Sequence, residues 1–541
     1  MNRASFYAAV LLALFPAQFV LSQNPAQSPP PSQAPGSPAV PTIRITSRLV
    51  FLDVTVIDRS GHPVVTGLTK NDFSITEDKK PQRIFSFEPP EVHTINLHAG
   101  AENSDGNAPR MILVLDFLNS RFQDFAYIRY EVRRFLNSQP SQLPYPTELM
   151  LVGNESLDML VSYTRDREEL LDAVAHLPPA LPYKEMQGSF WVERLAQSID
   201  ALQQIALQSK GVPGRKNIVW IGRGMPSIDP ATYDEPDTEI IQQYLHVTTN
   251  LLVDSRISLF VLYPGLHVYA RGGAYTEMDS YSDLGDDDPF MQGINFGVLS
   301  NETGGRLFYG RNDVNREVRQ AETLGSEYYT LTYQPQAGKD DGRFRRIRVT
   351  LRNPKLQALT KTGYFGPDRN AAANPRQQTN FNLVEAAQST IPMNALSLSI
   401  GGLVRHPDSR TISFNLNVLG RSLGWEETTK GAYAARLHVA AVSLDGSSHI
   451  LTSKVETVDI TGTAPDPAQF ARYTSVLPLR LRIPRKFASL RVVAEAENGG
   501  RIGTVETTRK AIEQAPAEPT PKPLLVPRSG PARAPAGPTA P

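Results

Sequence analysis

The segment from residue 109 to residue 335 constrains the fold most, because apolar runs alternate there with stretches of helical spacing. The runs MILVLD (111–116), KNIVWIG (216–222) and ISLFVLYP (257–264) have the length of strands and few polar residues. Continuous apolar strands between amphipathic helices are typical of a parallel sheet that is covered on both faces. The segment therefore predicts an α/β, Rossmann-like domain with a doubly wound, mostly parallel sheet.

Strand-rich segments flank this domain on both sides. Residues 42–92 predict a small β-unit of two hairpins: DRSGHP turns the first around Gly61, and EDKK turns the second, NDFSITEDKKPQRIFSF (71–87). Strands at 336–367 are expected to return to this β-unit. Residues 380–512 alternate apolar and polar residues in runs that Gly, Asp, Asn and Pro interrupt, which predicts a β-sandwich.

The two ends of the chain have a different composition. Residues 1–22 combine a positive start, an apolar run and a small-residue cleavage site, which predicts a signal peptide. Residues 23–41 predict a Pro-rich linker, and residues 513–541 a Pro- and Ala-rich disordered tail. No later segment has the length of a transmembrane helix. We therefore expect an exported protein of the periplasm, cell envelope or extracellular space, without a membrane span after signal cleavage.

Composition excludes several classes of function. The sequence has 55 Lys and Arg against 55 Asp and Glu, so its formal net charge is zero and no overall field attracts nucleic acid. We expect no nucleic-acid partner. With no cysteine, the chain cannot form disulfides, use a thiolate for catalysis or bind a metal through sulfur.

Four stretches carry a resemblance to a known family: DVTVIDRSGHPVVTGLTKNDFSITEDKKPQRIFSF, ILVLDFLNS, GRKNIVWIGRGMP, and the run from ETGGRLFYGRNDV through EYYTLTYQP and DGRFRRIRVTLR to TKTGYFGP. In this order, over about residues 45 to 510, they resemble the von Willebrand factor type A-related family of exported acidobacterial proteins. The resemblance implies that residues 109–335 form a type A domain between the β-unit and the β-sandwich. It implies no settled activity.

Adhesive type A domains hold a divalent cation with the carboxylate and hydroxyls of a D-x-S-x-S motif, and the resemblance places two such ligands here. Asp116 matches the carboxylate and Ser120 the second hydroxyl, whereas Leu118 stands at the first hydroxyl position. Mg²⁺ and Ca²⁺ need several oxygen ligands. The resemblance therefore implies a degenerate site, at which Asp116 and Ser120 remain candidate ligands for Mg²⁺ or Ca²⁺; no other cofactor is expected.

The remaining ligand positions of that motif lack their usual residues. Gly222, Arg223 and Gly224 follow the central strand where a carboxylate would stand. The second loop, between about 178 and 195, contains no Thr; its hydroxyls are Tyr183 and Ser189. Asp116 is instead expected to cap the next turn or to pair with a nearby arginine, either Arg121 or Arg223. A bound cation could take further oxygens from Asn119, Glu155 or Asp229.

Two charged segments have simpler interpretations. The loop SYSDLGDDDPF (280–290) is expected to be a solvated acidic loop, since its spacing does not match an EF-hand; its aspartates are Asp283, Asp286, Asp287 and Asp288. The strand GRFRRIRVTLR (342–352) is expected to expose its arginines to solvent. Nucleophile elbows, zinc-protease motifs and phosphate loops are absent from the sequence, so we expect no enzyme.

These patterns favour an exported, non-enzymatic protein-binding or scaffolding protein of the cell envelope, whose protein ligand the sequence does not identify. One alternative is a Mg²⁺- or Ca²⁺-dependent adhesin that uses Asp116 and Ser120. The other is an envelope hydrolase with an unrecognised site. Fold by itself does not choose among them.

Overall fold

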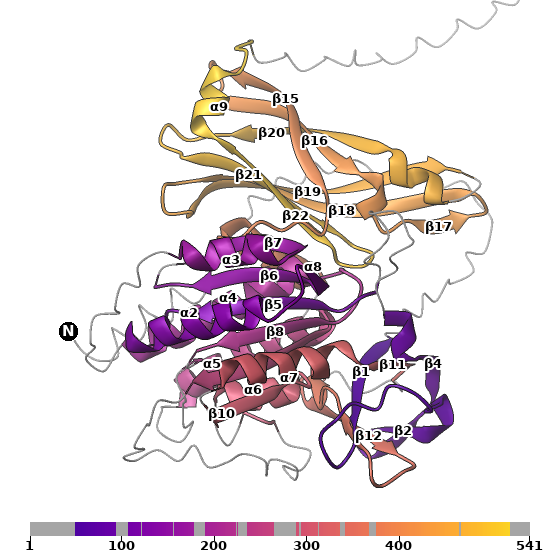
Figure 1. Cartoon of the computed structure of the whole chain (residues 1–541). Helices are drawn as coiled ribbons and strands as arrows, with labels where there is room; N and C mark the ends of the chain where they lie inside the picture. Colours follow the sequence, from indigo (N-terminus) through magenta and orange to yellow (C-terminus); the bar gives the residue numbers. More distant parts are fainter. Residues whose placement is uncertain are drawn as a thin grey trace, which may run out of the picture.

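The structure is a computed structural model of the whole chain. It describes residues 49–93, 107–120, 122–154, 156–177, 190–222, 224–225, 235–264, 288–290, 294–311, 313–335, 341–366, 375–464 and 467–519. The predicted signal peptide (1–22) and Pro-rich linker (23–41) lie outside these ranges. The structure has three parts: a central sheet unit, a β-unit beside it, and a C-terminal β-rich unit (Figure 1).

The central unit contains a six-stranded sheet in the order β10-β9-β8-β5-β6-β7. Every neighbouring pair is parallel except β6 and β7. In chain order the strands are β5 (Arg110–Asp116), β6 (Gln142–Val152), β7 (Leu157–Asp166), β8 (Lys216–Ile221), β9 (Ile257–Pro264) and β10 (Arg306–Arg311). β6 and β7 are added on one side of β5, and β8, β9 and β10 on the other, so the strand order reverses between β5 and β8, as in doubly wound sheets. The predicted doubly wound, mostly parallel sheet is confirmed.

Helices cover both faces of this sheet (Figure 1). One face packs on α2 (Phe122–Asn137), α3 (Arg167–Ala175) and α7 (Val314–Ser326). The other packs on α4 (Phe190–Ser209), α5 (Glu235–Asp254) and α6 (Phe296–Glu302). Alternate strand residues enter these two cores, which explains why the strands are apolar at nearly every position. Within the described ranges, no helix is both long and apolar enough to cross a membrane.

The β-unit consists of two four-stranded sheets, ordered β13-β1-β11-β4 and β14-β12-β2-β3. Its first half holds the strands β1 (Val50–Ile57), β2 (Phe73–Glu77), β3 (Lys80–Gln82) and β4 (Ile84–Glu88) and the 3₁₀ turns η1 (Lys70–Asp72) and η2 (Pro90–His93). The second half follows the central unit and holds β11 (Tyr329–Tyr333), β12 (Phe344–Leu351), β13 (Gln357–Leu359) and β14 (Gly363–Phe365).

Two predictions for the β-unit need correction. The second hairpin joins only β2 to the three-residue β3, and Ile84 begins β4, which pairs with β11 in the other sheet. The range 109–335 predicted for the sheet domain also includes β11, which lies between β1 and β4 in the β-unit. The sequence of β11, YTLTY, has the aromatic and β-branched residues that are typical of any strand. Only its pairing with β1 and β4 shows that it belongs to the β-unit and not to the central sheet.

The C-terminal unit contains a three-stranded sheet, β15-β16-β20, packed against a second sheet in which β18 pairs with β17, β19 and β21, and β21 pairs with β22. Its strands are β15 (Leu398–His406), β16 (Thr411–Leu419), β17 (Glu426–Thr429), β18 (Ala432–Leu444), β19 (Ile450–Thr463), β20 (Thr474–Arg482), β21 (Ser489–Ala496) and β22 (Ile502–Thr508), with 3₁₀ turns η5 (Gly420–Ser422) and η6 (Pro467–Arg472).

Helices modify both limits of this unit. The predicted range 380–512 starts inside α8 (Pro375–Gln388), whose Leu383, Ala386 and Ala387 enter the same core as α4 and the second sheet. At the other end, α9 (Arg509–Gln514) precedes residues 515–519, which extend beside β15. The first residues of the predicted disordered tail, 513–541, are therefore ordered, because Arg405 exchanges backbone hydrogen bonds with Pro516 and Glu518.

Candidate functional site

Asp116 is the last residue of β5, at the carboxyl edge of the central sheet. β5 lies between β6 and β8, so Asp116 is surrounded by the ends of two other strands. Its side chain is fully buried. The sequence prediction that this strand ends in a carboxylate at the edge where type A domains bind cations is therefore correct in position.

Nitrogen donors within the protein occupy both oxygens of this carboxylate. Asn119 donates its backbone N–H to Oδ1 at 2.8 Å, which makes Asp116 the cap of the following turn, one of its predicted roles. Trp220 Nε1 and the backbone N–H of Gly224 donate to Oδ2 at 3.0 and 2.9 Å. The amide Nδ2 of Asn119 lies 3.3 Å from each oxygen. Burial raises the pKa of Asp116, and these hydrogen bonds oppose that rise.

Gly222 closes the space beside Asp116 from the direction of β8. A Cβ atom at this position would lie 2.3 Å from Asp116 Cβ and 3.0 Å from Ser120 Oγ, and the backbone φ is +154°. Both the contact distance and the φ angle exclude a side chain here. The position at which the family motif would have a third-loop carboxylate is thus filled by backbone.

Of the other predicted ligand positions, the structure describes Leu118, Asn119 and Ser120. Leu118 is buried in the core that the sheet and α4 share, and this packing holds the turn after β5 against α4. Ser120 Oγ and Asn119 Oδ1 are buried and have no hydrogen-bond partner among the residues that the structure describes. Arg121, Glu155, Tyr183, Ser189, Arg223 and Asp229 lie outside the described residues. Across those ranges, no three His, Asp or Glu side chains are arranged to hold a metal ion.

A carboxylate that accepts N–H groups from three residues does not fit the role of a metal ligand. Mg²⁺ and Ca²⁺ require oxygens that point at one centre, and the lone pairs of Asp116 already point at nitrogen donors. The amide nitrogen of Asn119 also donates to Ser198 Oγ of α4, at 3.0 Å. This bond fixes the orientation of the amide. The arrangement therefore stabilises the ends of β5 and β8 against each other.

We expect Asp116→Asn to lower the free energy of unfolding by about 1–3 kcal/mol, because an amide NH₂ would face buried N–H donors. Denaturant unfolding followed by tryptophan fluorescence measures this change, since Trp220 is one of the donors. Ser120→Ala is the matched control and should change the free energy of unfolding by less than about 0.5 kcal/mol, because Ser120 Oγ forms no hydrogen bond with the residues that the structure describes. Equal stability of Asp116→Asn and the unmodified chain would contradict the structural role.

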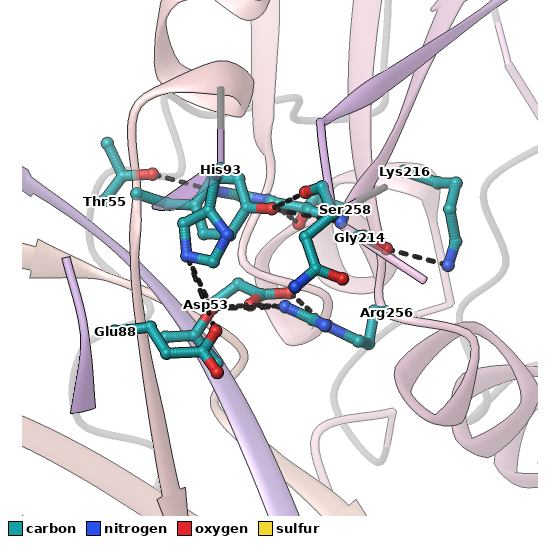
Figure 2. A network of polar contacts seen from close by, with 12 residues as sticks. Asp53, Thr55, Glu88, His93, Gly214, Lys216, Arg256 and Ser258 are labelled. Carbon is teal, nitrogen blue, oxygen red and sulfur yellow. Dashed lines mark hydrogen bonds and ion pairs between the residues drawn. The ribbon is translucent and has the colours of Figure 1, made fainter. Parts of the chain in front are cut away.

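A second polar cluster lies at the opposite, amino end of the sheet, where the β-unit meets β8 and β9 (Figure 2). Asp53 of β1 accepts two hydrogen bonds from Arg256, from Nη2 at 2.5 Å and from Nε at 3.0 Å. Thr330 of β11 donates its hydroxyl to the same carboxylate at 2.9 Å. Burial would raise the pKa of Asp53, but the arginine holds it at about 2. The pair is therefore charged at neutral pH.

Two further cations are buried next to this pair. Arg215 donates to Thr55 Oγ1 at 2.8 Å and to Ser258 Oγ at 3.0 Å. Lys216 donates to the carbonyl oxygens of Val212 and Gly214, at 2.6 and 2.9 Å. Burial lowers the pKa values of both Arg215 and Lys216. The negative charge of Asp53 acts on both side chains from a longer distance and favours their protonated forms. We therefore expect this joint between the two units to depend on the Asp53 carboxylate.

His93, the last residue of η2, closes one side of the joint. Its ring stacks on Tyr328 with a centroid distance of 4.3 Å, and its Nε2 lies 3.2 Å from Thr330 Oγ1. Glu88 Oε2 is 4.0 Å from the same nitrogen (Figure 2). Nδ1 is buried and has no partner within the described part of the chain. Burial lowers the pKa of His93 to about 4, so the ring is neutral at pH 7.

The sequence analysis did not identify this joint, although the sequence contains a signal for it. Asp53 is the one acidic residue in the strand VFLDVTVI, and Arg215 and Arg256 directly precede the apolar runs of β8 and β9. Arginines at the start of two parallel strands must lie at the same edge of the sheet. Nothing in the pattern shows that β1 docks at that edge, so the partner could not be inferred.

The two charged segments differ partly from their prediction. Asp288, the one aspartate of the acidic loop within the described residues, is 2.5 Å from His246 Nε2 on α5. The aspartates at 283, 286 and 287 lie outside them. Arg343, just before β12, and Arg348 within it are exposed as predicted, but Arg345 is largely buried and pairs with Asp341 at 2.5 Å. These pairs connect loops to strands of the fold.

No protein-family model and no curated protein matches the chain. Among solved structures it is similar to the VWA domain of SpRpn10, at 18% identity and a TM-score of 0.18 over 30% of this chain and 77% of that one. It is also similar to the vWF domain of the type V pili tip protein Mfa5 from Porphyromonas gingivalis, at 15% identity and a TM-score of 0.16 over 22% and 38%. The fold assignment rests on strand order and helix placement.

Proposed function

We propose that this chain is an exported, non-enzymatic protein-binding or scaffolding protein of the cell envelope, built on a type A-related domain whose cation site has been lost. The observation that carries the proposal is the closure of the Asp116 carboxylate by N–H donors of Asn119, Trp220 and Gly224. A ligand would then contact the loops of the carboxyl edge directly, without a bridging ion. Export rests on the N-terminal sequence pattern.

The joints between the three units support a scaffolding role. Asp53 and Arg256 connect the β-unit to the central sheet. On the other side, Lys210, directly after α4, pairs with Glu495 of β21 at 2.7 Å, and Asn382 of α8 donates to the same carboxylate at 2.9 Å. Buried polar contacts specify the relative orientation of the parts that make them. The units therefore form one body that can hold separate contact surfaces at fixed distances.

The metal-dependent adhesin makes a different prediction for the same edge. In that alternative Asp116 and Ser120 would coordinate Mg²⁺ or Ca²⁺, and chelation would abolish binding. The hydrolase alternative would require convergent acid, base and nucleophile groups. The raised pKa values of Glu148 and Glu302, about 7 in each, come first from burial inside the fold. Neither carboxylate has a His or Lys side chain as a hydrogen-bond partner among the residues described.

A photo-cross-linking experiment tests the proposal. Benzoylphenylalanine at Asp158, exposed beside the carboxyl edge on β7, should form discrete adducts with envelope proteins. The same group at Glu169, exposed beyond the other end of β7 on α3, is the matched control and should give far fewer adducts. Adduct yield should be the same in 2 mM EDTA as in roughly 2 mM Mg²⁺, since no ion takes part.

Other outcomes would identify the alternatives. Loss of the adducts in EDTA, together with a higher melting temperature in Mg²⁺ that Asp116→Asn abolishes, would establish the adhesin. Equal adducts at Asp158 and Glu169 would contradict recognition at the carboxyl edge. These measurements use the full mature chain, so they also preserve the joints between the units.

A further inference from the structure

The outer face of the sheet β15-β16-β20 is the part of the C-terminal unit that faces away from the central sheet (Figure 1). Leu477, Leu479 and Leu481 of β20 point into the core, so Val476, Pro478, Arg480 and Arg482 point outward. In the other sheet of this unit, β18, β21 and β22 are covered by this core and by α8, whereas β19 has no fully buried residue. The outer face of β15-β16-β20 therefore remains open to a partner.

Five cationic side chains lie at the end of β20 and in the loops next to it, and we name them the basic end. Arg482 lies opposite Thr411 and Arg480 opposite Ser413. The backbone of Ile483 donates to the carbonyl oxygen of Arg410, which brings the turn before β16 next to the end of β20. The exposed members of the basic end are Arg410, Arg480, Arg482, Arg485 and Lys486.

None of these five side chains forms an ion pair with any residue that the structure describes. Nearby acidic groups have other partners: Glu456 pairs with Lys454 at 2.5 Å, and Glu513 pairs with Arg509 at 2.7 Å. Asp408 lies in the turn between β15 and β16, two residues before Arg410. Five unpaired cations in a chain with zero formal net charge are a local field that attracts anions.

Amide side chains continue the face beyond the arginines. Asn417 donates to Ser399 Oγ at 3.3 Å, and the side chain of Asn415 makes no hydrogen bond with the described residues. A Cβ atom at Gly402 would come within 3.0 Å of Asn415 Nδ2, and φ at Gly402 is +58°. The glycine bulge of β15 therefore leaves this amide uncovered. Amides and guanidinium groups together bind hydroxyls and carboxylates.

We infer that this face binds a carboxylate-bearing polysaccharide, a polyuronate, through Arg480 and Arg482, with Asn415 contacting the sugar hydroxyls. Arg480 and Arg482 project about 7 Å apart, since a strand rises about 3.4 Å per residue. The row from Arg482 to Thr474 extends about 27 Å by the same rise, which suits a linear polymer rather than one small anion.

Charge and spacing argue against other occupants. A second copy placed face to face would oppose like charges, and residues 520–541 carry Lys522, Arg528 and Arg533 without any Asp or Glu. An anionic membrane surface would favour apolar side chains next to the cations. Val476, 54% accessible, is the one large exposed aliphatic side chain on β20, and it lies four residues from Arg480, about 14 Å along the strand, with Pro478 between them. One such side chain does not form the apolar face that insertion into a membrane needs.

Binding of the mature chain to polygalacturonate, measured by biolayer interferometry, tests the inference. The double variant Arg480→Glu and Arg482→Glu should raise Kd at least tenfold. The matched control reverses the charge of two exposed arginines at β12, Arg343→Glu directly before the strand and Arg348→Glu within it, and should change Kd less than twofold. Affinity should fall with added salt, and full methyl esterification of the polymer should abolish binding, because the esters carry no charge.

Contrary results would overturn the inference in distinct ways. Undiminished binding to the methyl-esterified polymer would exclude carboxylate recognition. An equal loss in both double variants, or none in either, would remove the assignment to the basic end. Tighter binding to phosphatidylglycerol vesicles or to duplex DNA than to polygalacturonate would reject the polyuronate and assign the basic end to that partner. Unchanged melting temperatures of both variants show that they remain folded.

Discussion

Asp53→Ala should lower the free energy of unfolding by about 3–5 kcal/mol, because it leaves buried charge without a counterion. Arg256 loses both hydrogen bonds to the carboxylate, and Arg215 loses the negative charge that supports it. For a folded unit of about 150–250 residues, this loss of free energy corresponds to a melting temperature that is lower by roughly 10 °C. Differential scanning calorimetry should show the shift in the first transition, since a chain of several units need not unfold in one step.

Two further variants separate charge from loss of packing. Asp53→Leu combined with Arg256→Met replaces both charges by apolar groups and should be more stable than Asp53→Ala. Asp459→Ala breaks the exposed pair that Arg436 and Asp459 form at 2.6 Å, and should leave the melting temperature unchanged. If Asp53→Ala had the same melting temperature as the unmodified chain, the joint would contribute nothing to the attachment of the β-unit.

Stability should increase as the pH falls from 8.5 to 6.5, because several buried carboxyl groups bind protons in the folded state. Burial raises the pKa of Glu385 to about 8 and of Glu148, Glu302 and Glu322 to about 7, from 4.5. As the pH falls through these values, the folded chain takes up protons that the unfolded chain does not. More protons bound in the folded state means that stability rises with falling pH.

Below pH 6.5 other groups oppose this gain. The pKa of His93 is lowered to about 4, so between pH 6.5 and 4 the unfolded chain binds a proton there that the folded chain does not. Asp53, with its pKa near 2, stabilises the fold above pH 4, and this contribution is lost as the pH falls toward 2. The four glutamates with raised pKa values outweigh this one ring until the pH approaches their ordinary value of 4.5, so the melting temperature should be highest between about pH 4 and 5.

Glu385→Gln tests the main contributor to this pH profile. The glutamine resembles the protonated acid, so the variant should be more stable at pH 8 by on the order of a few kcal/mol and equal to the unmodified chain at pH 5. Asp200, whose pKa burial raises to about 6, adds its charge to the environment of Glu385. The exposed substitution Glu426→Gln is the control. Parallel pH profiles of all three proteins would contradict the assignment.

The apolar runs at 111–116, 216–222 and 257–264 were sufficient to predict the central sheet, since residues that enter two cores must be apolar throughout. β7, at the sheet edge, was not predicted: its run LDMLVSYTRD mixes exposed and buried residues without strict alternation. α8 was not predicted either, because Asn382 and Glu385 interrupt its apolar face. Local pattern gives an element's type only where its environment is uniform.

The candidate site was predictable in position but not in bonding. Asp116 and Leu118 followed from the strand and from the family motif. The donation from Trp220 did not, because a tryptophan within an apolar strand reads only as core. The same limit applies to Asp53 and Arg256, which are 203 residues apart in sequence. Pairings over such separations depend on how whole units dock.

The β-unit has a consequence for how the protein is made. β1 pairs with β11, and Thr55 donates its hydroxyl to Leu324 O, 269 residues later in the chain. The amino-terminal strands therefore leave the ribosome, or the export channel, well before their partners exist. Until then the apolar residues Leu52 and Val54 have no cover, and such segments are prone to aggregate. We expect this half-unit to be the part of the newly made chain that most needs a chaperone.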